Sequence, residues 1–462
     1  MPGEPTGELI ACEDCGAVYR RRALAHGEIA SCTRCKAVLW RHSRLGLGDW
    51  LALALAALLV FAIANAYPVA AMSVGGAARS ATLLEAVAAT WRQGYALVAL
   101  MSGLSAFALP LAHLLVLLWI LVPLAAGRRP AGFAPATRLL EWLRPWCMVP
   151  VFLLGVVVAV VKLADMAAVT PGAGLAAFAA LMVLLTVLGR LDAHALWRHA
   201  EQAGVVAARI APAAPSHHAA GGAAAAAAAA AHGAPQADGG SDLRPQELAG
   251  CHACGLVQAA PAAGAHAHCG RCGAVLHARK PDHLARTWAL LAAAAILYLP
   301  ANLYPVMTTR GVTGSSSHTI LGGVVELWTY GSWDIALIVF VASVMVPLTK
   351  LLALALLAWT TQRGGGASLV ARTRMYRMVE FVGQWSMLDV YVVVLLSALA
   401  DFGGLMRITA GVGAAAFGMV VILTMLAAMS FDPRAAWDNP GPQPIPEPAR
   451  GLPPAPARQA PG

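Results

Sequence analysis

Eight of the nine cysteines in this chain fall into four Cys-x-x-Cys pairs. The pairs form two groups of four: Cys12, Cys15, Cys32 and Cys35, then Cys251, Cys254, Cys269 and Cys272. Two such pairs can place four thiolates around one ion, which is the arrangement that zinc takes in structural sites. The spacing predicts two structural zinc sites, with iron in a rubredoxin-like site or redox-active dithiols as the alternatives. Four thiolates leave no open coordination position, so neither site is expected to be catalytic and we expect no enzyme activity.

A second set of residues with potential chemistry consists of polar side chains inside apolar stretches. Lys350 follows Ser343 by seven residues on one helical face, and Ser386 and Asp389 are three residues apart on another predicted helix. Thr424 lies in the middle of a third. Polar and ionisable groups at membrane depth are costly and usually functional. We expect a Lys350–Asp389 pair surrounded by hydroxyls.

The role of this pair has three interpretations. One is a static polar lock between helices, and another is a proton- or charge-coupled site that biases two conformations. In the third, Lys350 extends to the membrane interface. Asp192 and its counterpart Asp432 are interpreted as capping residues at the membrane surface.

The composition shows which environment must position these residues. The chain of 462 residues is 59% apolar and only 12% charged, whereas a soluble domain carries about 25% charged residues. The apolar residues occur in long stretches, such as 109–126 and 411–429, that approach the length needed to cross a bilayer. The chain is therefore expected to be an integral membrane protein. The net charge of +9 comes largely from segments that flank the helices, which argues against a nucleic-acid partner.

An internal repeat organises the whole chain. The cysteine groups recur, the string ANAYPV at residue 64 recurs as ANLYPV at residue 301, and Trp146-x-Met recurs as Trp385-x-Met. Asp192 and Trp197 recur as Asp432 and Trp437. These landmarks keep one order at an offset of 237 to 240 residues. The Asn-x-Tyr-Pro strings are interpreted as helix ends, where proline stops the helix and asparagine binds freed backbone groups.

The fold class predicted from the repeat is a mainly α, polytopic membrane protein of two tandem units, each a zinc ribbon plus about four transmembrane helices. The domains are zinc ribbon 1 (1–45), transmembrane unit 1 (46–200), an Ala/Gly/His-rich linker (201–245), zinc ribbon 2 (246–282), transmembrane unit 2 (283–438) and a Pro-rich disordered tail (439–462). In each unit the first helix ends at the Asn-x-Tyr-Pro string. The second helix is expected near 95–125 and 333–359, the third near 146–168 and 381–400, and the fourth near 174–190 and 409–430.

Arginines give the expected orientation. Arg128, Arg129, Arg138 and Arg144 are placed between the second and third helices, and Arg363, Arg372, Arg374 and Arg377 occupy the same place in the second unit. The positive-inside rule then puts both ribbons and both termini in the cytosol. The first 45 residues lack the apolar core of a signal peptide, which agrees with this expectation.

In combination, the two four-cysteine ribbons, the Asn-x-Tyr-Pro-Val and Trp-x-Met strings and Phe431-Asp-Pro-Arg434 resemble the paraquat-inducible protein A family. The resemblance implies a multi-pass protein of the Gram-negative inner membrane whose partner is a periplasmic MCE-domain protein that forms a tunnel. It implies movement of phospholipid between inner and outer membranes, with lipid loaded or received at the tunnel base. The family's intramembrane polar positions fall here on Ser343, Lys350, Ser386, Asp389, Thr424 and Asp192. The chain has no Walker motif, so the proton-motive force or a lipid gradient is the expected energy source.

Two other function classes remain open at this point. One is a membrane protein that exchanges electrons between thiols and quinone, and the other is a stand-alone secondary transporter. Metal analysis with thiol counting distinguishes the first from a zinc protein. Co-purification of an MCE-domain protein distinguishes the second from a subunit of a lipid transport system.

Overall fold

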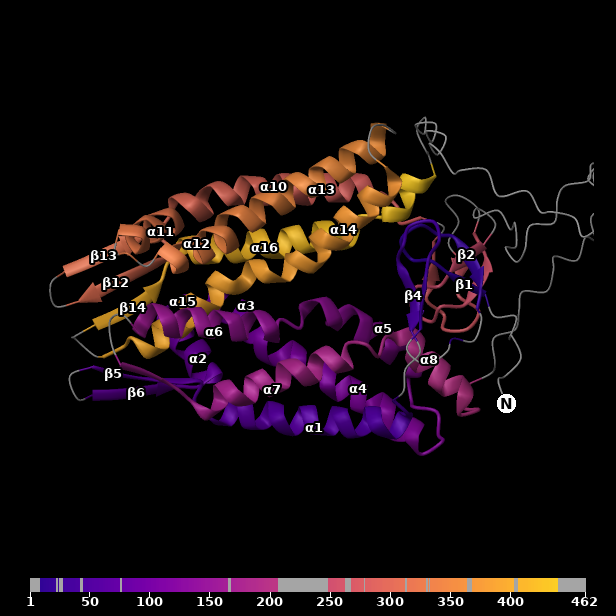
Figure 1. Ribbon diagram of the computed structural model, residues 1–462, viewed down its shortest axis with the longest axis horizontal. Helices are drawn as coiled ribbons and strands as arrows, with labels where there is room; N and C mark the ends of the chain where they lie inside the picture. The colour runs from indigo at the N-terminus through magenta and orange to yellow at the C-terminus, as the bar shows by residue number, and fades with distance from the viewer. Residues whose placement is uncertain are drawn as a thin grey trace, which may run out of the picture.

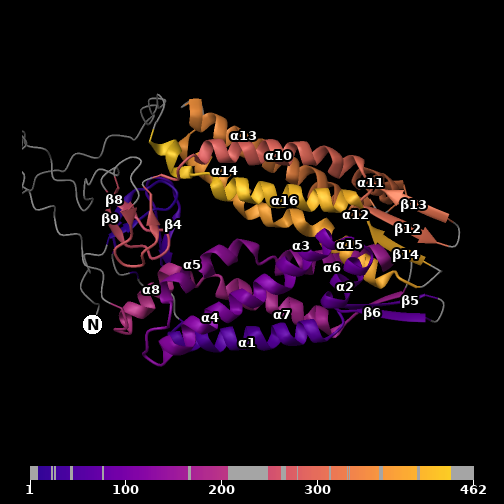
Figure 2. The same ribbon diagram turned by 180° about the vertical axis from the view of Figure 1, so that it is seen from behind.

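The computed structural model describes residues 9–21, 24, 28–41, 45–74, 77–164, 168–206, 248–261, 267–277, 279–311, 314–329, 331, 333–363, 368–402 and 406–438. Most of the predicted linker and the whole predicted tail lie outside these residues. The helices run roughly along one long direction, with the two cysteine ribbons at one end and two small sheets at the other (Figures 1 and 2). We call these the ribbon end and the sheet end.

Each ribbon consists of two short antiparallel hairpins that carry one Cys-x-x-Cys pair each. Ribbon 1 contains β1 (Leu9–Ala11), β2 (Val18–Arg20), β3 (Ile29–Ser31) and β4 (Val38–Arg41). Ribbon 2 contains β8 (Leu248–Gly250), β9 (Val257–Ala259), β10 (Ala267–His268) and β11 (Val275–Leu276). Gly16 and Gly273 have positive φ angles, at 74° and 66°, directly after their cysteine pairs. Both ribbons therefore have the turn geometry that suits a metal knuckle.

The two membrane units repeat one order of elements, which confirms the mainly α fold class. Unit 1 comprises α1 (Leu47–Ala66), β5 (Ala70–Val74), β6 (Ala77–Ala81), α2 (Leu83–Arg92), α3 (Ala96–Gly103), η1 (Leu104–Ala108), α4 (Leu109–Ala125), α5 (Phe133–Leu143), η2 (Arg144–Trp146), α6 (Val149–Ala164), β7 (Ala168–Pro171), α7 (Ala173–Leu188) and α8 (Ala193–Gln202). Unit 2 comprises α10 (His283–Leu303), β12 (Met307–Gly311), β13 (Gly314–His318), α11 (Ile320–Thr329), α12 (Trp333–Phe340), η3 (Val341–Met345), α13 (Val346–Arg363), α14 (Leu369–Gly383), η4 (Gln384–Met387), α15 (Leu388–Leu399), β14 (Met406–Ala410), α16 (Val412–Ser430) and η5 (Pro433–Trp437).

Seven helical segments in the described part of the chain are long and apolar enough to span a membrane. An eighth span arises if α7 and α8, which meet at a bend of 62°, count as one. Four helices per unit were expected. Helix α7 alone has 16 residues, so it is shorter than the other spans.

The third helix of each unit begins much closer to the ribbon end than the sequence suggested. In unit 1 the continuous span begins at Phe133, and in unit 2 it begins at Leu369. The prediction that Arg138, Arg144 and the arginines at 372, 374 and 377 lie in a loop is therefore wrong. They lie on the helical extensions α5, η2 and α14, which project from the apolar span at the ribbon end. Short runs between arginines supplied no helical signal long enough to be recognised.

The sheet end was not anticipated. Each unit builds a three-stranded antiparallel sheet, in the order β6-β5-β7 in unit 1 and β13-β12-β14 in unit 2. The third strand joins from about 100 residues away, with Met307 opposite Ala410 and Ala70 opposite Pro171. Between the hairpin and the next span lies a short amphipathic helix, α2 or α11. Glu85 is part of a capping box with Thr82 at the start of α2, at 2.8 Å from Thr82 N.

The Asn-x-Tyr-Pro strings end α1 and α10, as predicted. Asn65 Nδ2 donates to the Phe61 carbonyl at 2.8 Å, and Asn302 Nδ2 donates to the Tyr298 carbonyl at 2.9 Å. The string also holds the start of the last helix. Gly411 N donates to Val306 O at 2.7 Å, and Gly413 N donates to Pro305 O at 3.0 Å. Unit 1 has the same pair of bonds, from Gly172 and Gly174.

We predict that Gly411→Ala destabilises the protein by roughly 2–3 kcal/mol, because overpacked sites cost about that much. A Cβ at this position would lie 2.1 Å from the Pro305 carbonyl oxygen, so backbone must shift. Gly323→Ala is the matched control, since a Cβ there meets nothing within 4 Å. Thermal denaturation in detergent checks the difference. Equal melting temperatures for the two variants would contradict the steric account.

Helix α15 joins the two units. Eleven of its twelve residues are buried, and it packs against α6 and α2 of unit 1. Tyr391 shares a hydrogen bond of 2.7 Å with Ser105, and Ser397 shares one of 3.0 Å with Thr90. A Cβ on Gly155 would lie 3.0 Å from Tyr391 Cβ, so this glycine allows α6 and α15 to approach closely. The core of the molecule is therefore the seam between the repeats.

Candidate metal centres and intramembrane polar residues

Each cysteine group converges on a single point. All four sulfur atoms of each group lie within 4.8 Å of one another, and all eight cysteines are buried. The closest sulfurs are 3.5 Å apart in ribbon 1, for Cys12–Cys35 and Cys15–Cys32, and 3.6 Å apart in ribbon 2, for Cys251–Cys272 and Cys254–Cys269. A disulfide needs about 2.05 Å. A tetrahedral zinc ion with bonds of about 2.3 Å places its sulfurs about 3.8 Å apart. The geometry therefore fits a tetrathiolate metal site and not a disulfide.

A difference between the surroundings of the two sites involves Tyr19. Tyr19 places its hydroxyl 3.2 Å from Cys32 Sγ and 3.0 Å from Thr33 Oγ1. The equivalent residue in ribbon 2 is Gln258, which instead accepts a hydrogen bond from Gly270 N at 3.2 Å. Hydrogen bonds to ligand atoms tune metal affinity. The Tyr19 hydroxyl therefore gives site 1 a side-chain hydrogen bond to a ligand sulfur that Gln258 does not reproduce.

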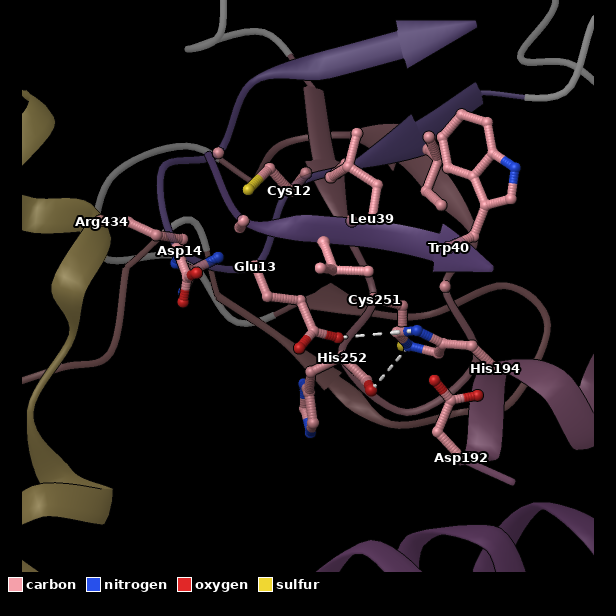
Figure 3. A pocket seen from close by; sticks show the side chains of 18 of the residues that line it. Cys12, Glu13, Asp14, Leu39, Trp40, Asp192, His194, Cys251, His252 and Arg434 are labelled. Atoms are coloured by element: carbon pink, nitrogen blue, oxygen red, sulfur yellow. Dashed lines mark hydrogen bonds and ion pairs between the residues drawn. The ribbon is translucent and has the colours of Figure 1, made fainter. Parts of the chain in front are cut away.

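A cleft of about 1420 Å³ separates the ribbons from the ribbon end of the helices, and Figure 3 shows it from close by. Glu13 of ribbon 1 approaches His194 Nδ1 at 3.5 Å, and His194 Nε2 lies 3.0 Å from the His252 carbonyl of ribbon 2. Asp192 also lines the cleft. Its carboxylate accepts from Ala195 N at 2.6 Å and caps α8. Asp192 therefore has the expected capping role, at the bend between α7 and α8.

Asp432 is the counterpart of Asp192 and is almost completely buried. It accepts from Arg434 Nε and Nη2 at 3.0 Å each, and from Lys280 N at 3.0 Å. Burial by itself raises the pKa of this carboxyl, but the charge and hydrogen bonds of Arg434 and the Lys280 N–H outweigh it and lower the pKa to about 2. The carboxylate thereby ties the end of ribbon 2 to the segment that follows α16.

Asp432→Asn is predicted to lower stability by about 2 kcal/mol at neutral pH, which follows from a pKa of about 2 against about 4 in the unfolded chain. A depressed pKa stabilises the fold above the unfolded value, and this stabilisation disappears only as pH falls from about 4 towards 2. The deficit should therefore be the same at pH 7 and pH 5 in thermal denaturation. Asp282→Asn is the control, because Asp282 is exposed and its φ of 49° suits asparagine. A deficit that vanishes by pH 5 would contradict the assignment.

The intramembrane polar residues are placed in two groups rather than one. Lys350 is 2% exposed, and its Nζ lies 3.5 Å from the Gly383 carbonyl oxygen. Ser343 is fully buried one element earlier, in the π-turn η3. It lines a small cavity together with Asp389, His318 and residues of both units. The cavity measures about 60 Å³, which is room for a few water molecules.

The prediction of a Lys350–Asp389 pair is wrong. The described contacts of Lys350 include no carboxylate. The two residues sit at different depths. Seven residues of helix separate Ser343 from Lys350 by about 10 Å along the axis, and Asp389 lies at the level of Ser343. Lys350 instead contacts the backbone at the end of α14, next to η4. A Cβ on Gly383 would lie 3.0 Å from Nζ, so glycine provides the space for the ammonium group.

Of the remaining predicted residues, Thr424 and Asp192 are not joined to Lys350. Thr424 is buried in α16, where its hydroxyl donates to Val421 O at 2.9 Å. Ser386 falls in η4, and its side chain is outside the described part of the chain. Asp192 lies at the ribbon end. Sequence reasoning missed the π-turns: Ser105 occupies η1 as Ser343 occupies η3, and its hydroxyl is bonded to Tyr391, whereas Ser343 Oγ has no hydrogen-bond partner among the described residues.

Comparison with known proteins identifies relatives of this chain. A family model described as paraquat-inducible protein A matches residues 47–201 and again 284–440, which are the two membrane units. The chain is 33% identical to the Intermembrane transport protein PqiA of Escherichia coli K12, over 93% of this chain and 95% of the relative. It is 28% identical to the Lipophilic envelope-spanning tunnel protein A of the same organism, over 94% and 92%.

A third relative, a Probable intermembrane transport protein of Haemophilus influenzae, is 26% identical over 94% of this chain and 96% of the relative. No solved structure gave a significant match. The double match of the family model coincides with the repeat and with the helices of the two membrane units. The chain belongs to the paraquat-inducible protein A family.

Proposed function

We propose that this protein is the inner-membrane subunit of an MCE-type lipid transport system. It moves phospholipid between the inner and outer membranes, loading or receiving lipid at the base of a periplasmic tunnel formed by an MCE-domain partner. The names of the relatives, which describe intermembrane transport and an envelope-spanning tunnel, support this proposal. Their naming as transport proteins also agrees with a protein that is not an enzyme.

The orientation follows from charge. Arginines such as Arg128, Arg138 and Arg374 gather at the ribbon end, and the positive-inside rule assigns that end to the cytosol. The sheet end then faces the periplasm, where a tunnel-forming partner would dock. Buried thiols in a reducing compartment favour metal over disulfide, and we assign zinc to both tetrathiolate sites.

The observation that carries the proposal is the pair of polar positions inside the membrane units. Lys350 and Ser343 are buried on consecutive elements of one span, and Ser343 and Asp389 open onto a cavity at the junction of the two repeats. A charged group at this depth is expensive in lipid and usually serves transport or coupling. We assign proton coupling to this polar cluster, because the chain has no nucleotide-binding motif.

The proposal is tested by isolation and by lipid tracing. Affinity purification from membranes should bring down a periplasmic MCE-domain protein. Cells that lack the chain should accumulate newly labelled phospholipid in one of the two membranes, and expression of the chain should restore the distribution. A stand-alone transporter would purify without an MCE partner. A normal phospholipid distribution in cells without the chain would refute the proposal.

A further inference from the structure

Besides the exposed Glu13–His194 pair with unit 1, ribbon 1 makes close contacts with unit 2, which does not directly follow it in the sequence. The Arg34 guanidinium lies 4.6 Å from the ring centre of Trp437, which belongs to η5 of unit 2. Arg377 of α14 donates to the Cys35 carbonyl at 2.9 Å and forms an ion pair of 3.1 Å with Asp14. Trp437 packs against the four buried cysteines of ribbon 1 in one apolar cluster. Ribbon 1 therefore rests on unit 2.

Ribbon 2 makes the reciprocal contact. The Arg271 guanidinium lies 4.4 Å from the ring centre of Trp197, in α8 of unit 1, and forms an ion pair of 2.6 Å with Glu201. The two tryptophans are anchored alike within their own units. Trp197 Nε1 donates to Thr137 at 3.3 Å, and Trp437 Nε1 donates to Thr373 at 3.2 Å. Each tryptophan is thus held by its own unit and covered by the ribbon of the other.

The ribbons also touch each other where they cross. Strand β1 packs beside β8 and β9, and a Cβ on Gly250 would lie 2.6 Å from Ala11 Cβ. Ala11 and Gly250 are equivalent positions of the repeat, 239 residues apart. The two ribbons therefore meet at equivalent positions, and both lie together at one end of the molecule (Figure 2).

The metal sites control the residues that make these contacts. Arg34 stands between Cys32 and Cys35, and Arg271 stands between Cys269 and Cys272. A knuckle of two thiolates on one ion fixes the intervening residues in a tight turn. Without the ion the turn loses the bonds that shape it, since small tetrathiolate modules owe their fold to the metal. The arginine then no longer faces its tryptophan in a defined direction.

We propose that the two metal-loaded ribbons act as a crossed clamp that joins the ribbon ends of the two membrane units. A metal ion in ribbon 1 orders the ribbon end of unit 2, and a metal ion in ribbon 2 orders the ribbon end of unit 1. Loss of the metal from ribbon 1 therefore loosens η5 and the start of α14, while α8 and α5 stay ordered. Loss of the metal from ribbon 2 loosens α8 and α5, while the start of α14 stays ordered. This role is independent of what the protein transports.

Hydrogen exchange followed by mass spectrometry on the full chain in detergent tests the clamp. In Cys32→Ser/Cys35→Ser, amides of residues 433–438 and 369–377 should exchange about tenfold or more faster, which is the response to losing local order. Amides of α8 should keep their rates. The reciprocal variant, Cys269→Ser/Cys272→Ser, should accelerate α8 and spare 369–377. Residues 433–438 are not a readout for this variant, because Lys280 and Arg279 of ribbon 2 also bond to Asp432 and Asp438. Faster exchange in the unit that directly follows the altered ribbon, or no change in either unit, would overturn the proposal.

A second variant separates docking from metal binding. Arg34→Ala removes the contact with Trp437 but none of the ligands, so the metal content should stay at two ions per chain while 433–438 exchanges faster. Arg20→Ala is the matched control, because Arg20 is an exposed arginine of the same ribbon. If the cysteine variants do not accumulate, Arg34→Ala alone decides. Unchanged exchange at 433–438 in that variant would refute the clamp.

Discussion

Purified Cys254→Ser/Cys272→Ser protein is expected to contain one zinc ion per chain, and the unaltered protein is expected to contain two. Serine is a poor zinc ligand, and the two remaining thiolates cannot complete a tetrahedral site. The apparent free energy of binding at such sites is on the order of 10 kcal/mol or more, and it is free energy of folding as well. The second ribbon should therefore unfold, with a large fall in thermal stability. Elemental analysis and thermal denaturation in detergent measure both effects.

The ninth cysteine provides the control. Cys147 lies outside both groups, between η2 and α6, so Cys147→Ser should retain two ions. Thiol counting adds a second criterion: after denaturation with a chelator, all nine cysteines should react. Fewer reactive thiols would indicate disulfides and support thiol–quinone chemistry. Iron in place of zinc would overturn the metal assignment, and absence of any metal would remove the basis of the clamp.

Lys350→Met is expected to reduce phospholipid movement between the two membranes by about tenfold or more, with little change in the amount of folded protein. Methionine retains most of the shape of lysine and removes its charge and its hydrogen bond to the Gly383 carbonyl. A side chain needed only for packing would tolerate this change. Labelled phospholipid, traced in cells that carry only the variant, measures the transport.

Thr349→Ala is the matched control, since Thr349 precedes Lys350 on the same helix and is exposed on the outside of the unit. It should transport normally. Thermal denaturation of both purified variants shows whether a loss of transport reflects unfolding. Normal transport by Lys350→Met would show that the lysine is a static contact and would remove proton coupling through this residue.

Local patterns were sufficient to predict the parts of this protein that depend on local chemistry. Metal ligands must come in pairs on tight turns, so Cys12 with Cys15 and Cys32 with Cys35 indicated a tetrathiolate site before any fold was known. An apolar run of about 20 residues has one solution in a bilayer, because every backbone group must be bonded within the segment. Because of the repeat, both the cysteine pairs and the apolar runs occur in each half of the chain. The strands of the sheet end gave no such signal, since they are five residues or fewer and the third strand of each sheet pairs across about 100 positions.

Contacts between residues that are far apart in the sequence could be assigned only from the tertiary structure. In a tandem repeat, Arg34 lies 163 residues before Trp197 and Arg271 lies 166 residues before Trp437, so the sequence alone assigns each ribbon to its own unit. In the structure each ribbon instead contacts the other unit, because equivalent surfaces can pair between the two copies as well as within one copy. Lys350 and Asp389 looked like partners by charge, but depth in the membrane separates them. Sequence determined which groups the molecule carries and how each span is built, and packing of the two units decided which groups meet.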